Sequence, residues 1–266
     1  MKFTVIGERI NTSRIAVRDA VAARDAAYIV EDVKRQEAAG AAYIDVNAGA
    51  RLGHETEDME WLLATIQSAV SVPVCLDSPD PRLLELAFAL VSREPLVNSI
   101  SLERERYEAM LPFLKGKECG VIALCMDDTG LPQSSDQVVE RAISLAGALE
   151  GIGVPRDKIH IDPLIQPIGT DATKGYMALE AVRGINQQLP GIRTTCGLSN
   201  ISFGLPQRKF INQAFLALLM GAGLTGAIID PLDDRMMATV KTVDMLFGRD
   251  EYCADFLSAV RAGQIV

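Results

Sequence analysis

The sequence predicts a single-domain α/β protein of the (β/α)8 TIM-barrel class, spanning residues 1–266. Short apolar runs alternate with longer amphipathic runs from end to end. Most of the short runs are continuously apolar, which is typical of parallel strands covered on both faces. Eight strand–helix units within 266 residues also match the usual size of this barrel. A doubly wound sheet is the alternative, but it usually has fewer strands, and no glycine fingerprint follows the first run.

The expected strands are the short apolar runs at 3–7, 43–47, 72–77, 95–99, 120–126, 158–162, 194–199 and 226–230. The clearest expected helices are amphipathic runs with recognisable start or stop signals, at 16–40, 55–70, 134–153 and 233–248. The first ends in glycine, the second has acids in its first turn, and the third begins with serine and ends with glycine. No linker or low-complexity tract interrupts the pattern, so one domain is expected.

Composition narrows the classes of partner. The net charge of −9 argues against nucleic acid or an anionic membrane as a partner. The opening residues turn polar too soon for a signal peptide, and no apolar run is long enough to span a bilayer. Five cysteines, odd in number and without a CxxC pair, indicate reduced thiols and predict a cytoplasmic location.

Polar residues gather where the expected strands stop. They are Glu8, Arg9, Asn11, Asp45, Asn47, Asp77, Asn98, Asp127, Asp128, Asp162, Ser199, Asn200 and Asp230. In a barrel these positions converge on the carboxyl-terminal mouth, where such enzymes have their active sites. At any single position, capping of the following helix is an equally good interpretation. The set as a whole favours a site, because several members directly follow apolar residues and a carboxylate near the core needs partners.

Side chains of Asp and Asn indicate recognition chemistry. A carboxylate accepts two parallel N–H bonds, and an amide both donates and accepts. Such a ring of groups suits a flat heterocycle edged with ring N–H, amine and carbonyl groups, of which a pterin is an example. No metal site is expected, since His54 and His160 are the only histidines and neither has a second histidine four residues on, which gives a His-rich zinc site little support. His160 is expected in the core, and Cys75 and Cys196 as small core residues.

Six motifs in order carry a resemblance to a known family: IGERIN (6–11), DVNAG (45–49), CLDS (75–78), VNS (97–99), IDPLI (161–165) and GLSNISFGLPQR (197–208). They resemble the pterin-binding methyltransferases, which include the methyltetrahydrofolate:corrinoid protein Co-methyltransferases and the folate domain of cobalamin-dependent methionine synthase. The resemblance extends from residue 6 to about residue 256, where it ends in the YCADF segment.

The resemblance implies roles for particular residues. Asp162 would hold the 2-amino and N3–H edge of the pterin, Asp77 and Asn98 the opposite part of the pyrimidine and the N8 side, and Asn200 would reach N5. Gly197 and Ser199 would line the same face. Supporting positions implied by the resemblance are Asn11, Asp45 and Asn47, with Gln207 and Arg208 near the folate tail or the partner protein. Asn200 is the residue expected to act in catalysis, because an amide can accept from protonated N5 or donate to neutral N5.

The implied reaction is methyl transfer between N5 of tetrahydrofolate or 5-methyltetrahydrofolate and the cobalt of a corrinoid, in an undetermined direction. The chain lacks the DxHxxG pattern of a cobalamin-binding segment, so the corrinoid is expected on a separate partner protein. Family resemblance also implies a homodimer. One alternative is a dihydropteroate synthase-like pterin enzyme, disfavoured because Asn200 rather than a basic residue follows Ser199. Another is a folate-binding module without chemistry of its own.

Overall fold

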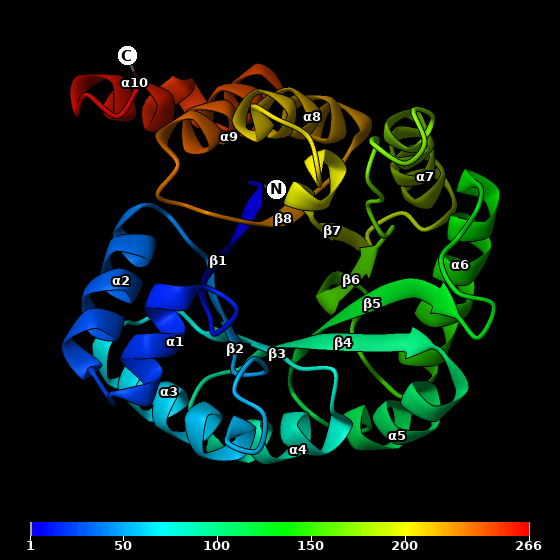
Figure 1. Cartoon of the computed structure of the whole chain (residues 1–266). Helices are drawn as coiled ribbons and strands as arrows, with labels where there is room; N and C mark the ends of the chain where they lie inside the picture. Colours follow the sequence, from blue (N-terminus) through cyan, green and yellow to red (C-terminus); the bar gives the residue numbers. More distant parts are fainter. Residues whose placement is uncertain (1, 266) are drawn as a thin grey trace.

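The protein is a closed barrel of eight parallel strands, described over residues 2–265 in a computed structural model (Figure 1). The strands follow one another around the barrel in chain order, and the last pairs with the first. Their bounds are β1 (Thr4–Asn11), β2 (Tyr43–Asn47), β3 (Val74–Asp77), β4 (Leu96–Leu102), β5 (Gly120–Asp127), β6 (Ile159–Asp162), β7 (Arg193–Gly197) and β8 (Gly226–Ile229). The TIM-barrel prediction is confirmed.

Helices form the outer ring around the strands (Figure 1). Their bounds are α1 (Ile15–Ala22), α2 (Ala26–Ala38), α3 (Glu55–Ala69), α4 (Pro81–Leu90), α5 (Arg104–Leu114), α6 (Ser135–Gly151), α7 (Lys174–Gln188), α8 (Arg208–Ala222), α9 (Asp234–Leu246) and α10 (Ala254–Arg261). Short 3-10 turns occur at η1 (Arg156–Lys158), η2 (Leu198–Ser202) and η3 (Glu251–Cys253). None of the helices within residues 2–265 combines the length and apolar character that a bilayer crossing requires.

Two expected elements differ in detail. The run at 16–40 is two helices, because Arg24 adopts a left-handed φ of 53° and Asp25 caps the second helix by accepting from the Tyr28 N–H. The strand expected at 194–199 ends at Gly197, and Ser199 and Asn200 lie on the η2 turn that follows. A turn and a site position therefore coincide at these residues.

Strand alternation explains why polar residues point into the barrel. Ile6, Cys75, Leu96 and Ile122 form a fully buried cluster, against which the partly buried Tyr43, Leu124 and Ile228 pack. This cluster is separate from the apolar layer between strands and helices. Inward-facing side chains recur every second residue along a barrel strand. Five of these apolar residues are followed, two positions later in the chain, by a polar residue that faces inward in the same way. These polar residues are Glu8, Asp45, Asp77, Asn98 and Asp230. The apolar layer thus carries a polar layer directly above it.

His160 and the cysteines belong to the packed interior. His160 is buried, its Nδ1 lies 2.9 Å from Thr195 Oγ1, and burial lowers its pKa to about 3. Its imidazole is therefore neutral at physiological pH. Cys75 and Cys196 are fully buried, and burial raises the pKa of both thiols well above the ordinary value. The expectation that these three residues are core residues is confirmed.

The interior apolar layer should be a large contributor to stability. We expect Ile122→Ala to lower the free energy of unfolding by about 3 kcal/mol, since it leaves a cavity in the closed barrel. The matched control is Ile143→Ala on α6, where the side chain is 44% exposed and the expected loss is about 0.5 kcal/mol or less. Urea unfolding measures both, and equal losses would contradict the layered packing.

Candidate functional site

The polar layer brings together the carboxyl-terminal ends of neighbouring strands. Asp77 of β3 is the direct register partner of Asn98 of β4, and Asp162 of β6 lies beside Leu124 of β5. The Asn47 side chain at the end of β2 donates from Nδ2 to Asp77 Oδ2 at 2.8 Å and accepts the Gly49 N–H through Oδ1 at 2.9 Å. Four of the predicted positions therefore line neighbouring segments of one mouth.

Asp45 lies deepest among the predicted carboxyl groups. It is 3% exposed, and within the described part of the chain its Oδ1 has no hydrogen-bond partner. Burial, then the nearby Asp77 carboxylate, raises its pKa well above the ordinary value, although the Cys75 thiol and the Asn98 amide favour ionisation. Burial raises the pKa of Asp77 too, against the Asn47 amide and the Arg106 charge. Asp45 and Asp77 therefore both favour the protonated form more than an exposed aspartate does.

Asp162, the last residue of β6, is buried. It is 7% exposed, and burial raises its pKa to about 7, although the backbone N–H groups of Leu164 and Gly197 favour the charged form. The Leu164 N–H donates to Oδ1 at 2.8 Å. Its carboxyl group has little water around it, so a ligand with two parallel N–H donors would stabilise the carboxylate strongly.

Glu8 belongs to the same layer, but the sequence-based site residues did not include it. It is half-buried, and burial raises its pKa to about 7. The Asp230 carboxylate adds to this rise, while Arg14, Arg208 and Arg9 oppose it. The spacing of two residues from the inward-facing Ile6 was the available signal for this position.

The η2 turn presents Asn200 on the β7 side of the mouth, across the barrel from Asp77 and Asn98. The Asn200 side chain is exposed, and its Nδ2 lies 3.5 Å from the point where a Cβ on Gly197 would stand. Arg208 fixes the turn, because Nη2 donates to the Ser199 carbonyl at 2.7 Å and Nε donates to Ser202 Oγ at 3.0 Å. The Asn212 amide donates to Ser199 Oγ at 3.3 Å. The turn therefore has a defined shape, and no hydrogen bond from residues 2–265 engages the Asn200 side-chain amide.

Two further predicted residues lie in turns that lead into helices. Asn11 accepts the Ser13 N–H at 2.9 Å and so shapes the turn into α1. Gln207 is exposed and has a left-handed φ of 54° directly before α8. Asp127 forms the expected turn, accepting from the Thr129 N–H at 2.9 Å and from Arg141 Nη2 at 2.8 Å.

Arg106, on the first turn of α5, holds two of the strand ends that form the site. Its guanidinium donates to the carbonyls of Ser78 (2.9 Å), Pro79 (2.6 Å) and Ser99 (2.9 Å). Ser78 and Ser99 directly follow Asp77 and Asn98. Sequence reasoning missed this residue, because its partners are backbone carbonyls that have no sequence signature.

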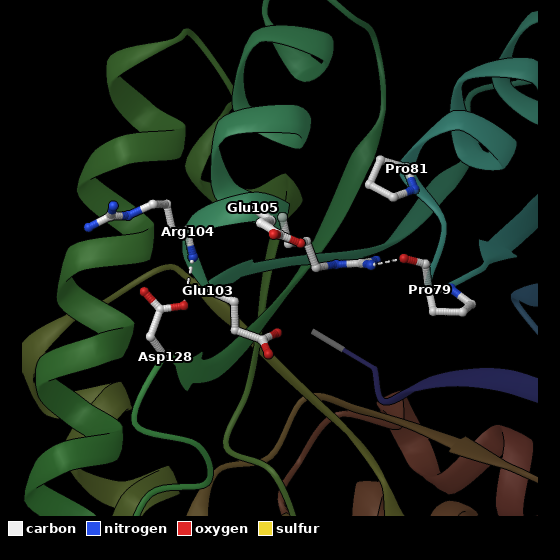
Figure 2. Close-up of a pocket in the computed structure, with 7 residues that line it drawn as sticks. Pro79, Pro81, Glu103, Arg104, Glu105 and Asp128 are labelled. Carbon is white, nitrogen blue, oxygen red and sulfur yellow. Dashed lines mark hydrogen bonds between the residues drawn. The ribbon is translucent and has the colours of Figure 1, made fainter.

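A surface cavity of about 780 Å³ lies beside Arg106, lined by residues that follow β3, β4 and β5 (Figure 2). Pro79 and Pro81 line one side, and Glu103, Arg104 and Asp128 the other. Figure 2 shows the Arg104 backbone N–H donating to Asp128 Oδ1, at 3.1 Å. Over the described range, 2–265, no three His, Cys, Asp or Glu side chains gather closely enough to hold a metal ion.

The buried carboxyl groups predict the pH dependence of stability. Because the folded protein raises the pKa of Asp162 from 3.8 to about 7, stability should fall as pH rises between these values and level off above them. Asp162→Asn should therefore stabilise the ligand-free protein at pH 8, by up to about 4 kcal/mol, and by much less at acidic pH. Urea unfolding at acidic and alkaline pH tests this. The exposed Asp157→Asn is the control, and equal pH dependence in both variants would contradict the burial effect.

Comparison with known proteins connects this geometry to a family. Residues 7–230 match the family model of pterin binding enzymes. The chain is 35% identical to the methylcorrinoid:tetrahydrofolate methyltransferase of Eubacterium limosum, over 98% of this chain and 97% of that protein. It is 29% identical to the methionine synthase of Mycobacterium tuberculosis over 85% of this chain, which corresponds to 20% of that longer protein.

Solved structures show the same fold at lower identity. The dihydropteroate synthase of Xanthomonas albilineans, in complex with 7,8-dihydropteroate, superposes with a TM-score of 0.70 at 15% identity and covers 92% of this chain and 93% of that one. The Coxiella burnetii dihydropteroate synthase, in complex with pteroic acid, gives a TM-score of 0.69 at 15% identity, with coverage of 92% and 94%. The full-length relative and the matched family model agree with the polar barrel mouth, and the chain belongs to the pterin-binding enzymes.

Proposed function

We propose that the protein is a methyltransferase that moves a methyl group between N5 of tetrahydrofolate and the cobalt of a corrinoid carried by a separate protein. The observation that carries the proposal is the 35% identity to a methylcorrinoid:tetrahydrofolate methyltransferase, which extends over 98% of the chain and includes every element of the mouth. The transfer is a reversible displacement, so the same site serves either direction.

The buried residues of the mouth bind the pterin ring. Asp162 accepts the 2-amino and N3–H donors of the pyrimidine, whose two N–H groups match the two oxygens of a carboxylate. Asp77 and Asn98, paired across β3 and β4, meet the opposite part of the ring. Binding the N–H donors stabilises the Asp162 carboxylate, so pterin binding should lower the raised pKa of this residue.

Asn200 acts at the reacting nitrogen. The charge on N5 changes during transfer, because N5 must be protonated to leave and unprotonated to attack. The amide of Asn200 can accept from the protonated form and donate to the neutral form. An interaction that is strongest as the charge changes lowers the activation barrier more than it improves binding.

Two alternatives predict different results. A dihydropteroate synthase would join a pterin to an aminobenzoate, and its solved structures share the fold with this chain at 15% identity. Asn200, where that family has a basic residue after the serine, favours methyl transfer instead. A folate-binding module would bind tetrahydrofolate and leave the corrinoid unchanged.

The proposed activity can be tested by mixing the protein with a methylated corrinoid protein and tetrahydrofolate and following the cobalt absorption spectrum. Methyl transfer predicts conversion of methylcobalt(III) to cobalt(I) faster than without the protein, with formation of 5-methyltetrahydrofolate. Folate binding without a spectral change would support the binding module, and condensation of a pterin with aminobenzoate would support the synthase.

Asn200→Ala should slow single-turnover methyl transfer by about 100-fold, because one hydrogen bond to the reacting atom is lost. Tetrahydrofolate affinity should change little, since the ring edge is held elsewhere. The control is Gln188→Ala, which truncates an exposed amide at the far end of α7. A full transfer rate in Asn200→Ala with bound folate would refute the role.

Arg106→Met should weaken tetrahydrofolate binding by about tenfold, since three carbonyl contacts that hold Asp77 and Asn98 are lost. Removing the charge also raises the pKa of Asp77 further, so the loss of affinity should be larger at acidic than at alkaline pH. Calorimetric titration measures both effects. Arg104→Met, at the exposed neighbouring position, is the control, and equal affinities in the two variants would contradict the positioning role.

A further inference from the structure

We propose that Glu8 is the group that exchanges a proton with N5 during methyl transfer. This inference rests on the proposed function and deepens it by naming the residue that supplies and removes the proton, either directly or through one water. It uses a side chain that the expected set of pterin-binding residues leaves without a role.

The barrel order places Glu8 on the side of the mouth where N5 is expected. β1, which carries Glu8, pairs with β8, and β8 pairs with β7, from which the Asn200 turn follows. Arg208 connects the two sides, because it donates to the Ser199 carbonyl at 2.7 Å and its charge acts on the Glu8 carboxyl group. Asp77 and Asn98, which are expected to hold the N8 side of the ring, lie across the barrel on β3 and β4. N5 is opposite N8 in the ring, so a ring held in this way would direct N5 toward Glu8 and Asn200.

The carboxyl group of Glu8 has no fixed hydrogen-bond partner among the described residues. Among residues 2–265 the structure records no hydrogen bond to it, although it is half-buried. The adjacent Arg9 is engaged elsewhere, with Nε and Nη2 on Asp32 at 2.7–3.0 Å and Nη1 on Asp230 Oδ2 at 2.8 Å. A partly desolvated carboxyl group without a fixed partner is suited to proton exchange with a ligand.

Charged groups on three sides set the proton affinity of Glu8. Asp230 on the β8 side disfavours its ionisation, and Arg9, Arg14 and Arg208 favour it. Asp45 on β2 is also within electrostatic range. Burial outweighs all of these and raises the pKa of Glu8 to about 7, so both protonation states are populated near neutral pH. That is the condition under which one residue works as acid in one direction and as base in the other.

Other titratable groups of the mouth fit this role less well. Asp162 is needed as a carboxylate for the ring edge, and Asp77 is bound by Asn47. Asp45 lies deeper, at 3% exposure. His160 is buried in the barrel interior and contacts Thr195.

The proposed step balances in both directions. With tetrahydrofolate as acceptor, the N5 lone pair forms a bond to the methyl carbon, and the cobalt–carbon bond breaks with its electron pair remaining on cobalt, so cobalt(III) becomes cobalt(I). N5 then carries an ammonium proton, which passes to the Glu8 carboxylate. In reverse, protonated Glu8 delivers the proton to N5 of 5-methyltetrahydrofolate, and the methyl group passes to cobalt(I) while the C–N electron pair remains on N5.

The test compares wild type, Glu8→Gln, Glu8→Asp and the exposed control Glu108→Gln. Methylcobalamin and tetrahydrofolate serve as substrates in single-turnover transfer, followed by cobalt absorption over about 1.5 pH units on either side of the Glu8 pKa. In the wild type the rate should rise with pH through about 7, as the Glu8 carboxylate forms. Glu8→Gln should transfer about 100-fold more slowly at the alkaline plateau and lose this pH dependence, with little change in tetrahydrofolate Kd. Glu8→Asp should retain the pH dependence at a reduced rate, and Glu108→Gln should match the wild type.

A second readout is independent of activity. The folded protein favours protonated Glu8, so the wild type should lose thermal stability as pH rises from 4.5 to about 7. Glu8→Gln should lose less thermal stability over this range, and so have the higher Tm at pH 8.

A Glu8→Gln variant with the wild-type transfer rate and pH dependence would overturn the proposal, as would a pH dependence of Tm that the substitution leaves unchanged. Absence of transfer by wild type that binds tetrahydrofolate would instead show that the proposed function itself has failed, and this proposal with it.

Discussion

Four carboxyl groups facing one end of a closed barrel impose the main electrostatic constraint on this protein. Glu8, Asp45, Asp77 and Asp162 occupy the inward-facing layer above the apolar interior, and burial raises the pKa of each. Burial is the main cause in each case, and at Asp45 the charges of Asp77 and Glu8 add to it, so the mouth retains protons near neutral pH. A flat ligand that presents several N–H donors relieves this cost. Burial of these carboxyl groups thus accounts for both the preference for a pterin edge and the capacity for proton exchange.

Two arginines next to the inward-facing carboxyl groups affect their charge and hold the backbone around them. Arg106 fastens the backbone after Asp77 and Asn98 and carries a charge close to Asp77. Arg9 is bound to Asp32 and Asp230, which limits its effect on the neighbouring Glu8. These arginine charges therefore neutralise only part of the negative charge of the carboxyl groups. The site consequently keeps its affinity for N–H donors while the backbone around it is held firmly.

Much of this architecture could be predicted from the sequence, because buried parallel strands have continuous apolar runs and their polar ends mark the mouth. The break between α1 and α2 was missed because Arg24 and Asp25 stand within an otherwise amphipathic run. Glu8 was missed as a site residue because alternation identifies it only once the inward face of β1 is known. Arg106 could not be found, since its contacts are with backbone carbonyls brought close only when β3 pairs with β4. The orphaned Asp45 oxygen likewise appears only in three dimensions.

The central claim is that the inward-facing polar layer, and not the neighbouring surface cavity, receives the pterin. A crystal structure of the protein with tetrahydrofolate tests this directly. We expect the pyrimidine edge on Asp162, with Asp77 and Asn98 at the opposite part of the ring, and N5 between Asn200 and Glu8. A pterin seated in the cavity beside Arg106, or a ring in the mouth with N5 turned away from β1 and β7, would contradict the account.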